Sequence, residues 1–239
     1  MDFLLAGEGP SDLGSLDDVG VLKKGPMAFM VDKLCAENTL PTPNYRHLLS
    51  HNQLSKLAAK SSRGGPERPA RSEGAKFYDQ AAALARETKN ESGVCGAIYF
   101  QDSDRYDWNL LCRAITLGFK SVEDISEEGM ENRCVAMLPR PKSEAWLLAY
   151  YQKNEQGQQA YNHAERFEGM SGNDSSPNSV KQKLAEMLEC TVKEIYHHID
   201  ETTIQEIDWY RVDMPSFNQF KTDFLGVAKK LQEQSISAP

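Results

Sequence analysis

Residues 97–104 read Ala97-Ile98-Tyr99-Phe100-Gln101-Asp102-Ser103-Asp104, an apolar run that ends in two carboxylates one residue apart. The β-branched and aromatic residues of this run predict a buried strand of a parallel sheet. Ligands of open parallel sheets bind beyond the carboxyl ends of the strands, where Asp102 and Asp104 stand. On a strand, side chains two residues apart point the same way, and two carboxylates in one small volume repel each other unless a cation lies between them. We therefore predict that Asp102 and Asp104 bind a hard divalent cation such as Mg²⁺.

A second short apolar run, at residues 3–6, ends in the sequence Gly7-Glu8-Gly9-Pro10-Ser11-Asp12. The two glycines allow backbone and ligand to approach closely, and a proline is tolerated in the first turn of a following helix. Asp12 follows Glu8 closely enough to join the same acidic cluster. This stretch therefore predicts a second strand that delivers Glu8 and Asp12 to the edge of the sheet where Asp102 and Asp104 lie.

A third apolar run, at residues 133–138, leads into Pro139-Arg140-Pro141-Lys142-Ser143-Glu144-Ala145-Trp146-Leu147-Leu148. This pattern predicts a strand followed by a helix, with Ser143 as the N-cap and Glu144 in the first turn. Capping alone explains Ser143 and Glu144. However, this is the third predicted strand that is followed by an acidic residue, and Lys142 lies two residues before Glu144. Both a capping role and a ligand role for Glu144 are therefore open at this stage.

The three stretches together resemble the Toprim fold, which is shared by topoisomerases, primases and the OLD family of nucleases. The resemblance lies in strand-Glu8-Gly-x-x-Asp12, in strand-Asp102-x-Asp104 and in Pro-x-Pro-Lys142-x-Glu144-x-Trp-Leu-Leu. The chain looks most similar to small stand-alone Toprim-like proteins that are encoded beside ABC/SMC-type ATPases in bacterial anti-phage systems. The likeness extends over nearly the whole chain, but only these three signatures are specific.

The resemblance implies an α/β fold of Toprim-like (Rossmann-like) type, with a mostly parallel central sheet flanked by helices. It implies a catalytic core over residues 1–150 and a mainly helical C-terminal extension over residues 151–239 that packs on the core. The implied cofactors are two ions of Mg²⁺ or Mn²⁺, held by Glu8, Asp12, Asp102, Asp104 and Glu144. The implied catalytic residues are Glu8, Asp102, Asp104 and Lys142, with Lys142 contacting the scissile phosphate. Glu8 is alternatively a general acid or base.

Charge leaves the question of a nucleic-acid partner open. The net charge of −8 opposes binding to phosphates, which is usually driven by Lys and Arg. However, metal ions reverse the sign of an acidic site, and the segment from Lys56 to Lys76 is locally basic. Residues 61–74 predict an exposed loop that either contacts a phosphate backbone or is merely solvated. The candidate nucleic-acid-binding residues are Arg63, Arg68, Arg71, Lys76, Arg105 and Arg140.

Composition indicates a folded cytoplasmic protein. No apolar run reaches the length of a membrane span, and the N-terminus lacks the features of a secretion signal. The five cysteines form no CxxC pair, so we expect reduced thiols and neither a zinc ribbon nor a disulfide framework. The chain contains no Walker A pattern, so a partner ATPase would be a separate protein. A homodimer is also compatible with the sequence.

Apolar spacing predicts the helices around these strands. Asp107 is either a third acid of the cluster or the N-cap of the helix that follows, and its residue type favours the cap. Residues 13–22, rich in Gly, Ser and Asp, predict a loop. The predicted helices cover residues 27–37, 54–60, 75–88, 109–118, 180–188, 192–199 and 217–231.

Three functions are compatible with these features of the sequence. The first is a metal-dependent endonuclease that acts as a defence effector and is held in check by a partner ATPase. The second is a non-catalytic Toprim-like subunit that uses its sheet as a docking surface. The third is a metal-dependent phosphohydrolase acting on nucleotides. A small closed pocket beside the acids would favour the phosphohydrolase, and an open groove would favour the nuclease.

Overall fold

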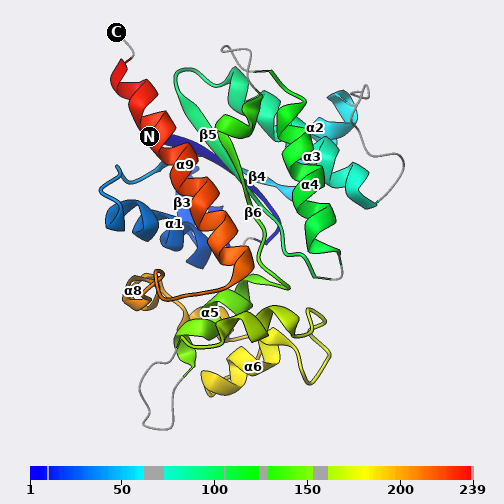
Figure 1. Ribbon diagram of the computed structural model, residues 1–239, viewed down its shortest axis with the longest axis vertical. Coiled ribbons are helices and arrows are strands. Elements are labelled where there is room, and N and C mark those ends of the chain that lie inside the picture. The colour runs from blue at the N-terminus through cyan, green and yellow to red at the C-terminus, as the bar shows by residue number, and fades with distance from the viewer. Residues whose placement is uncertain (10, 62–72, 105, 124–128, 153–160, 238–239) are drawn as a thin grey trace.

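The structure is a computed structural model that describes residues 1–9, 11–61, 73–104, 106–123, 129–152 and 161–237. Its centre is a four-stranded sheet in the order β4-β1-β5-β6, and every neighbouring pair of strands is parallel (Figure 1). The strands are β1 (Asp2–Gly7), β4 (Asn44–Ser50), β5 (Cys95–Phe100) and β6 (Cys134–Met137). The prediction of an α/β fold with a mostly parallel sheet is therefore confirmed.

The register of the sheet places the three predicted strand ends side by side. Gly7 at the end of β1 pairs with Phe100 at the end of β5, and Phe100 pairs with Met137 at the end of β6. Parallel pairing without an offset brings the chain segments that follow these strands to one edge of the sheet. The prediction that the three acidic stretches share this edge is confirmed.

Helices cover both faces of the sheet (Figure 1). On one face lie α1 (Pro26–Glu37) and α9 (Pro215–Ser237), and on the other lie α2 (His51–Ser61), α3 (Glu73–Asn90) and α4 (Trp108–Lys120). Side chains alternate along β1, so that Phe3 and Leu5 join the buried cluster under α1 and α9, whereas Leu4 and Ala6 join the opposite cluster. This three-layer arrangement explains why every residue of β5 is buried.

The sheet changes its winding direction between β1 and β5. The chain leaves β1 toward α1 on one face and reaches β4, whereas it leaves β5 toward α4 on the other face and reaches β6. At such a switch point the two departing connections diverge and open a crevice at the carboxyl ends of the strands. The topology thus makes the edge that follows β1 and β5 the expected ligand site.

The C-terminal third is helical where it is described, and its last helix returns to the sheet. The shorter elements are α5 (Ser143–Tyr151), η2 (Ala164–Gly169), α6 (Val180–Met187), α7 (Ile195–His198) and α8 (Glu201–Glu206). In Figure 1, α5 and α6 lie beyond the lower end of the sheet, and α9 runs back along its face. The rings of Phe3 on β1 and Phe224 on α9 are 5.8 Å apart. The proposed domain boundary at residue 150 stays a prediction.

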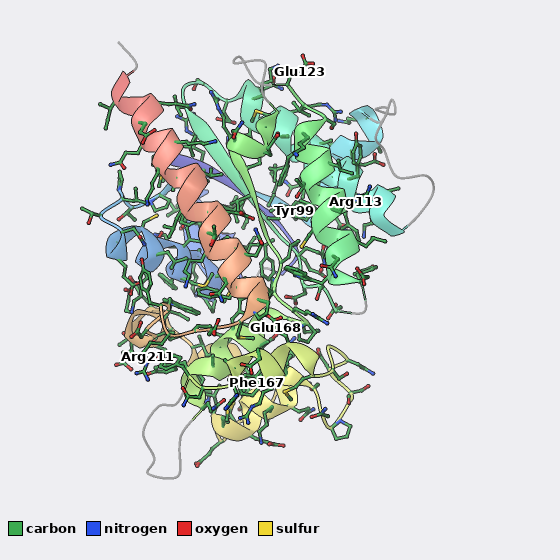
Figure 2. All side chains as sticks on the ribbon, viewed as in Figure 1. Tyr99, Arg113, Glu123, Phe167, Glu168 and Arg211 are labelled. Carbon is green, nitrogen blue, oxygen red and sulfur yellow. The ribbon has the colours of Figure 1, made fainter. Side chains whose placement is uncertain are left out.

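Two buried polar contacts join separate elements of the fold, one between the sheet and α3 and one between η2 and α9, and both involve residues labelled in Figure 2. The Tyr99 hydroxyl donates to Gln80 Oε1 at 2.8 Å, between the sheet and α3. The Glu168 carboxylate accepts from the backbone N–H and the hydroxyl of Ser216, at 2.8 and 2.6 Å, in the first turn of α9. The N–H groups in the first turn of a helix have no partner within the helix, so a hydrogen bond to one of them stabilises the helix.

Most predicted helices are present, with small differences in their ends. Asp107 is the N-cap of α4, because its carboxylate accepts from the N–H of Leu110 at 2.8 Å. Residues 13–22 were predicted as a loop, but they contribute to a hairpin of β2 (Gly14–Leu16) and β3 (Leu22–Lys24). Three-residue strands carry too few alternating side chains to be recognised in a sequence. The helix predicted over 192–199 is reduced to α7, and a 3₁₀ turn, η1 (Met130–Asn132), precedes β6.

Among the helices of the described residues, none combines the length and apolar character that a membrane crossing requires.

Candidate functional site

Three carboxylates from different parts of the chain meet beneath the carboxyl edge of the sheet. Asp12 follows β1, Asp102 follows β5, and Glu144 lies in the first turn of α5. Ser143 joins two of them, since its backbone N–H donates to Asp102 Oδ1 at 3.0 Å and its hydroxyl donates to Asp12. We call Asp12, Asp102 and Glu144 the inner acids.

The N-terminus of α5 is capped differently from the prediction. Ser143 is the first residue of α5, and the N-cap is Lys142, which makes no side-chain cap bond. Instead, the Asp102 carboxylate accepts from the first N–H group of the helix. A carboxylate from a neighbouring strand thus takes the place of a local cap, and it also faces the positive end of the α5 dipole. The prediction of Ser143 as cap was wrong because its hydroxyl is engaged by Asp12.

Tyr196 connects two of the inner acids. Its hydroxyl lies 2.9 Å from Asp12 Oδ1 and 2.8 Å from Glu144 Oε1. A phenol has a single O–H proton, so it donates to only one of these oxygens. The second short contact is favourable when that carboxyl group is protonated and itself donates. This geometry therefore favours protonation of one of the two carboxyl groups that Tyr196 bridges.

The electrostatics of the inner acids favour their protonated forms. Burial raises the pKa of all three carboxyl groups, and hydrogen bonds from Ser143 and Tyr196 offset only part of the effect on Asp12. The charges of Asp12, Glu144 and Asp104 raise the pKa of Asp102 further, and the charge of Asp12 does the same for Glu144. Three acids that are costly to ionise together form a site that a bound cation would stabilise.

A pocket of about 860 Å³ opens at the same edge of the sheet, and its lining includes Gln101 and Lys142, the chain neighbours of Asp102 and Ser143, but none of the inner acids. Glu8 and Asp104, both exposed, line it from the strand ends, and Lys142 lines it from the turn before α5. On one side it is bounded by α3 through Lys76, and on the other by residues 170–174. The volume and the exposed lining fit an extended or nucleotide-sized polar ligand.

Asp102 and Asp104 do not point in the same direction. The strand ends at Phe100, so the alternation that paired the two acids in the sequence no longer applies. Asp104 adopts a left-handed backbone with φ of +43°, and its N–H donates to the Pro141 carbonyl at 2.8 Å. Asp102 consequently turns inward to α5, whereas Asp104 faces the pocket and lies 3.3 Å from Lys142.

Two lysines connect the acids to one loop carboxylate. Lys142 Nζ lies 3.0 Å from Asp174 and 3.3 Å from Asp104, and Lys181 Nζ lies 3.4 Å from Asp174 and 3.5 Å from Glu144. Burial lowers the pKa of both lysines, but the nearby carboxylates outweigh it and raise the pKa overall. Burial likewise raises the pKa of Asp174, and its bond to Lys142 and the charge of Lys181 reverse that change. All three groups are therefore charged at neutral pH.

The remaining predicted residues have different positions. Glu8 lines the pocket, and its carboxylate accepts a hydrogen bond from Gln101. Lys76 lines the same pocket, and Arg140 is exposed in the turn before α5. The other candidate nucleic-acid contacts lie outside the described residues, namely Arg63, Arg68, Arg71 and Arg105.

The chemistry of the inner acids fits a hard divalent cation. Their carboxylate oxygens are the ligands that Mg²⁺ and Mn²⁺ prefer, and Glu144 Oε2 is buried without a hydrogen-bond partner. Within the described part of the chain, no group of three His, Cys, Asp or Glu side chains is already arranged around a metal position.

Sequence reasoning missed three residues of this site. Lys181, Tyr196 and Asp174 come from the C-terminal third, which the sequence divides into polar loops and amphipathic helices. None of them belongs to a recognisable motif. Lys181 lies in the first turn of α6, on the face that an amphipathic pattern assigns to solvent. Only the packing of α6 on α5 brings it to Glu144.

Comparison with known proteins adds no relative to this description. No family model matches the chain, and neither the curated proteins nor the solved structures contain a match.

Proposed function

We propose that the protein is a divalent-metal-dependent endonuclease of Toprim type, which hydrolyses phosphodiester bonds. One observation carries the proposal: Asp12, Asp102 and Glu144 converge at the switch point of a parallel sheet, beside an open pocket lined by acids and lysines. Clusters of titratable groups with strongly shifted pKa values are expected at functional sites, and here the shifts of all three acids are upward. The resemblance of the three sequence signatures to Toprim proteins points to the same chemistry.

In this proposal Asp102, Asp12 and Glu144 would hold the ions, and Asp104 and Glu8 would complete the set from the pocket side. Bound Mg²⁺ or Mn²⁺ would activate water at neutral pH and stabilise the charge that develops on the phosphate. Lys142 adds a positive charge at the mouth of the acidic site, where it orients the phosphate and stabilises the leaving oxygen. Alternatively, the exposed Glu8 would act as a general base and accept a proton from water in the pocket.

The open pocket favours a polymeric substrate over a small one. Glu8 and Asp104 are exposed at the pocket, and Lys76 supplies a further exposed positive charge from α3. A phosphate backbone would pass these groups, and Lys76 would neutralise a neighbouring phosphate. The volume of about 860 Å³ also accommodates a nucleotide, so a metal-dependent nucleotide phosphohydrolase is the second candidate.

The resemblance also suggests the biological setting. In this proposal the nuclease is the effector of an anti-phage system, and a separate ABC/SMC-type ATPase holds it inactive until infection. A non-catalytic docking subunit of such an ATPase complex would use the same fold without hydrolysis. Activity measurements must therefore be made both with and without a co-expressed ABC/SMC-type ATPase.

The test is cleavage of supercoiled plasmid DNA and of total tRNA in Mg²⁺, Mn²⁺ or EDTA. Asp102→Asn serves as the active-site variant, and Asp18→Asn is the matched control because it removes the same charge from an exposed position. We expect metal-dependent cutting by wild type and Asp18→Asn and none by Asp102→Asn. A set of nucleoside triphosphates in parallel detects the second candidate. No cutting and no phosphate release under any condition would contradict both enzymes and favour the docking subunit.

A further inference from the structure

The loop at residues 170–178 presents one carboxylate to both lysines of the site. Asp174 lies 3.0 Å from Lys142 Nζ and 3.4 Å from Lys181 Nζ, so a single carboxylate bridges two ammonium groups. Two lysines around one anion form an arrangement that also suits a phosphate oxygen pair. Each lysine additionally contacts an acid of the site, Lys142 through Asp104 and Lys181 through Glu144. The bridged anion therefore sits next to the acids that are proposed to bind metal.

The loop is held on the site by its own contacts. Ser171 forms a parallel bridge with Ser179, with its N–H donating to the Asn178 carbonyl at 3.1 Å. Gly172 packs on Asp104, and a Cβ at this glycine would lie 3.1 Å from Asp104 Cα. Gln182 donates to the Asp174 carbonyl at 3.4 Å. These contacts position the Asp174 carboxylate beside the two lysines.

The exposure of the three side chains favours replacement of the Asp174 carboxylate by an anionic ligand. The Asp174 side chain is 45% exposed, whereas those of Lys142 and Lys181 are 12% and 22% exposed. The lysines are thus the fixed, partly buried partners, and the carboxylate is the more accessible one. An ion pair whose carboxylate is exposed to solvent is weakened by screening, so an incoming anion can replace Asp174. Residues 170–174 also line the pocket, so movement of Asp174 would open the site to that pocket.

We propose that Lys142 and Lys181 form a phosphate-binding subsite, and that Asp174 occupies it as an internal mimic of the substrate phosphate until substrate displaces it. This inference rests on the proposed function, which it deepens by adding Lys181 to the substrate contacts and by giving the loop an autoinhibitory role. The ligand is a phosphate group of a nucleic acid, held next to the inner acids.

The test is a double-mutant cycle on binding, made in EDTA so that it does not depend on catalysis. The probes are a short fluorescein-labelled single-stranded oligonucleotide, followed by anisotropy, and inorganic pyrophosphate, followed by calorimetry. The proteins are wild type, Asp174→Asn, Lys181→Met and the double variant, with Asp18→Asn as control for the loss of one negative charge. Thermal unfolding of each variant verifies that it is folded.

We expect Asp174→Asn to bind both probes roughly tenfold more tightly, because two lysines lose their internal partner and gain the ligand. The gain should disappear in the Lys181→Met background and should be absent in Asp18→Asn. The salt dependence of oligonucleotide binding should also become steeper, as expected when lysines that were paired internally become phosphate contacts. Unchanged or weaker binding of both probes by Asp174→Asn would overturn the proposal.

The two probes separate this inference from the proposed function. Tighter binding of pyrophosphate alone supports the phosphate subsite but contradicts the nucleic-acid substrate, and it points to a nucleotide. Conversely, metal-dependent cleavage by wild type with no gain in binding by Asp174→Asn supports the nuclease and overturns the role of Asp174.

Discussion

The backbone N–H of Ser143 donates to the Asp102 carboxylate at 3.0 Å, so the acid that follows β5 caps the helix that follows β6. This contact links the sheet edge to α5, and through α5 it places Glu144 among the inner acids. The Asp102 carboxylate therefore has two roles, capping α5 and contributing to the acidic site. Substitutions of Asp102 can remove its charge while keeping the capping hydrogen bond, or remove both.

Replacing Asp102 should separate stability from activity. Asp102→Asn retains an oxygen that accepts from Ser143 and removes a charge whose burial is unfavourable. We therefore expect the free energy of unfolding at pH 7 to be unchanged or higher, while metal-dependent cleavage is abolished. Asp102→Ala also loses the cap, which costs about 1 kcal/mol of stability relative to Asp102→Asn. Urea unfolding of both variants makes the comparison, and equal stability of the two would argue against the capping role.

The stability of the metal-free protein should fall as the pH rises. Burial raises the pKa of Asp12, Asp102 and Glu144 above the ordinary values of 3.8 and 4.5, so the folded state binds more protons than the unfolded state above those values. Stability gained from these protonated groups is present at acidic pH and is lost as pH rises through the folded pKa values. Groups whose pKa values are lowered act in the opposite direction, Asp2 and Asp174 below about pH 4 and His51 below about pH 6.5.

Urea unfolding between pH 4 and pH 8 in EDTA measures this dependence. Asp102→Asn should reduce the decline, because it removes one of the groups responsible. Added Mg²⁺ should restore stability at the higher pH, since the cation stabilises the ionised acids. A stability that rises steadily with pH in EDTA would show that the inner acids are ionised at little cost.

Tyr196 should stabilise the protein through its hydroxyl. Tyr196→Phe removes the bridge between Asp12 and Glu144 and leaves both carboxyl groups with fewer partners. The expected loss is about 1–3 kcal/mol in the free energy of unfolding, measured with urea in EDTA. Tyr210→Phe is the matched control, because the Tyr210 hydroxyl bonds to Asn38 at an exposed position. Its effect should stay within about 0.5 kcal/mol, and equal losses in the two variants would contradict the bridge.

Two glycine substitutions should have opposite effects on stability. Gly7 ends β1 with φ of +140°, and a Cβ there would lie 1.9 Å from the Phe100 carbonyl oxygen. Gly7→Ala should therefore cost about 3 kcal/mol or more, through strain and backbone displacement at the site. Gly226 lies within α9 with no atom within 4 Å of a Cβ, so Gly226→Ala should stabilise by up to about 1 kcal/mol. Thermal unfolding distinguishes them, and a tolerated Gly7→Ala would refute this geometry.

The sequence predicts β1 and β5 well because these strands are buried on both faces, whereas no residue of β4 is buried. Residues 3–6 and 97–100 are continuous apolar runs, and each ends in acid at the place where the strand leaves the core. Burial and charge therefore mark the strand ends without any knowledge of tertiary contacts. By contrast, the three-residue strands β2 and β3 are too short for such a signal.

The site is only partly predictable from the sequence. Asp12, Asp102 and Glu144 are recognisable because each follows a strand, but Lys181 and Tyr196 reach them through the packing of α6 and α7. Periodicity assigns such residues to a helix face and says nothing about the neighbour of that face. The direction of Asp104 was also beyond sequence reasoning, because its positive φ arises from the turn that follows β5.

The most direct test of the central claim is calorimetric titration of the metal-free protein with Mn²⁺. Wild type should bind Mn²⁺ with release of protons, because burial raises the pKa values of the inner acids and a carboxyl group must be deprotonated when it binds the ion. The double variant Asp102→Asn/Glu144→Gln should not bind, and Asp18→Asn should bind as wild type does. No binding by wild type, or equal binding by the double variant, would contradict a metal site at the inner acids and with it the proposed nuclease.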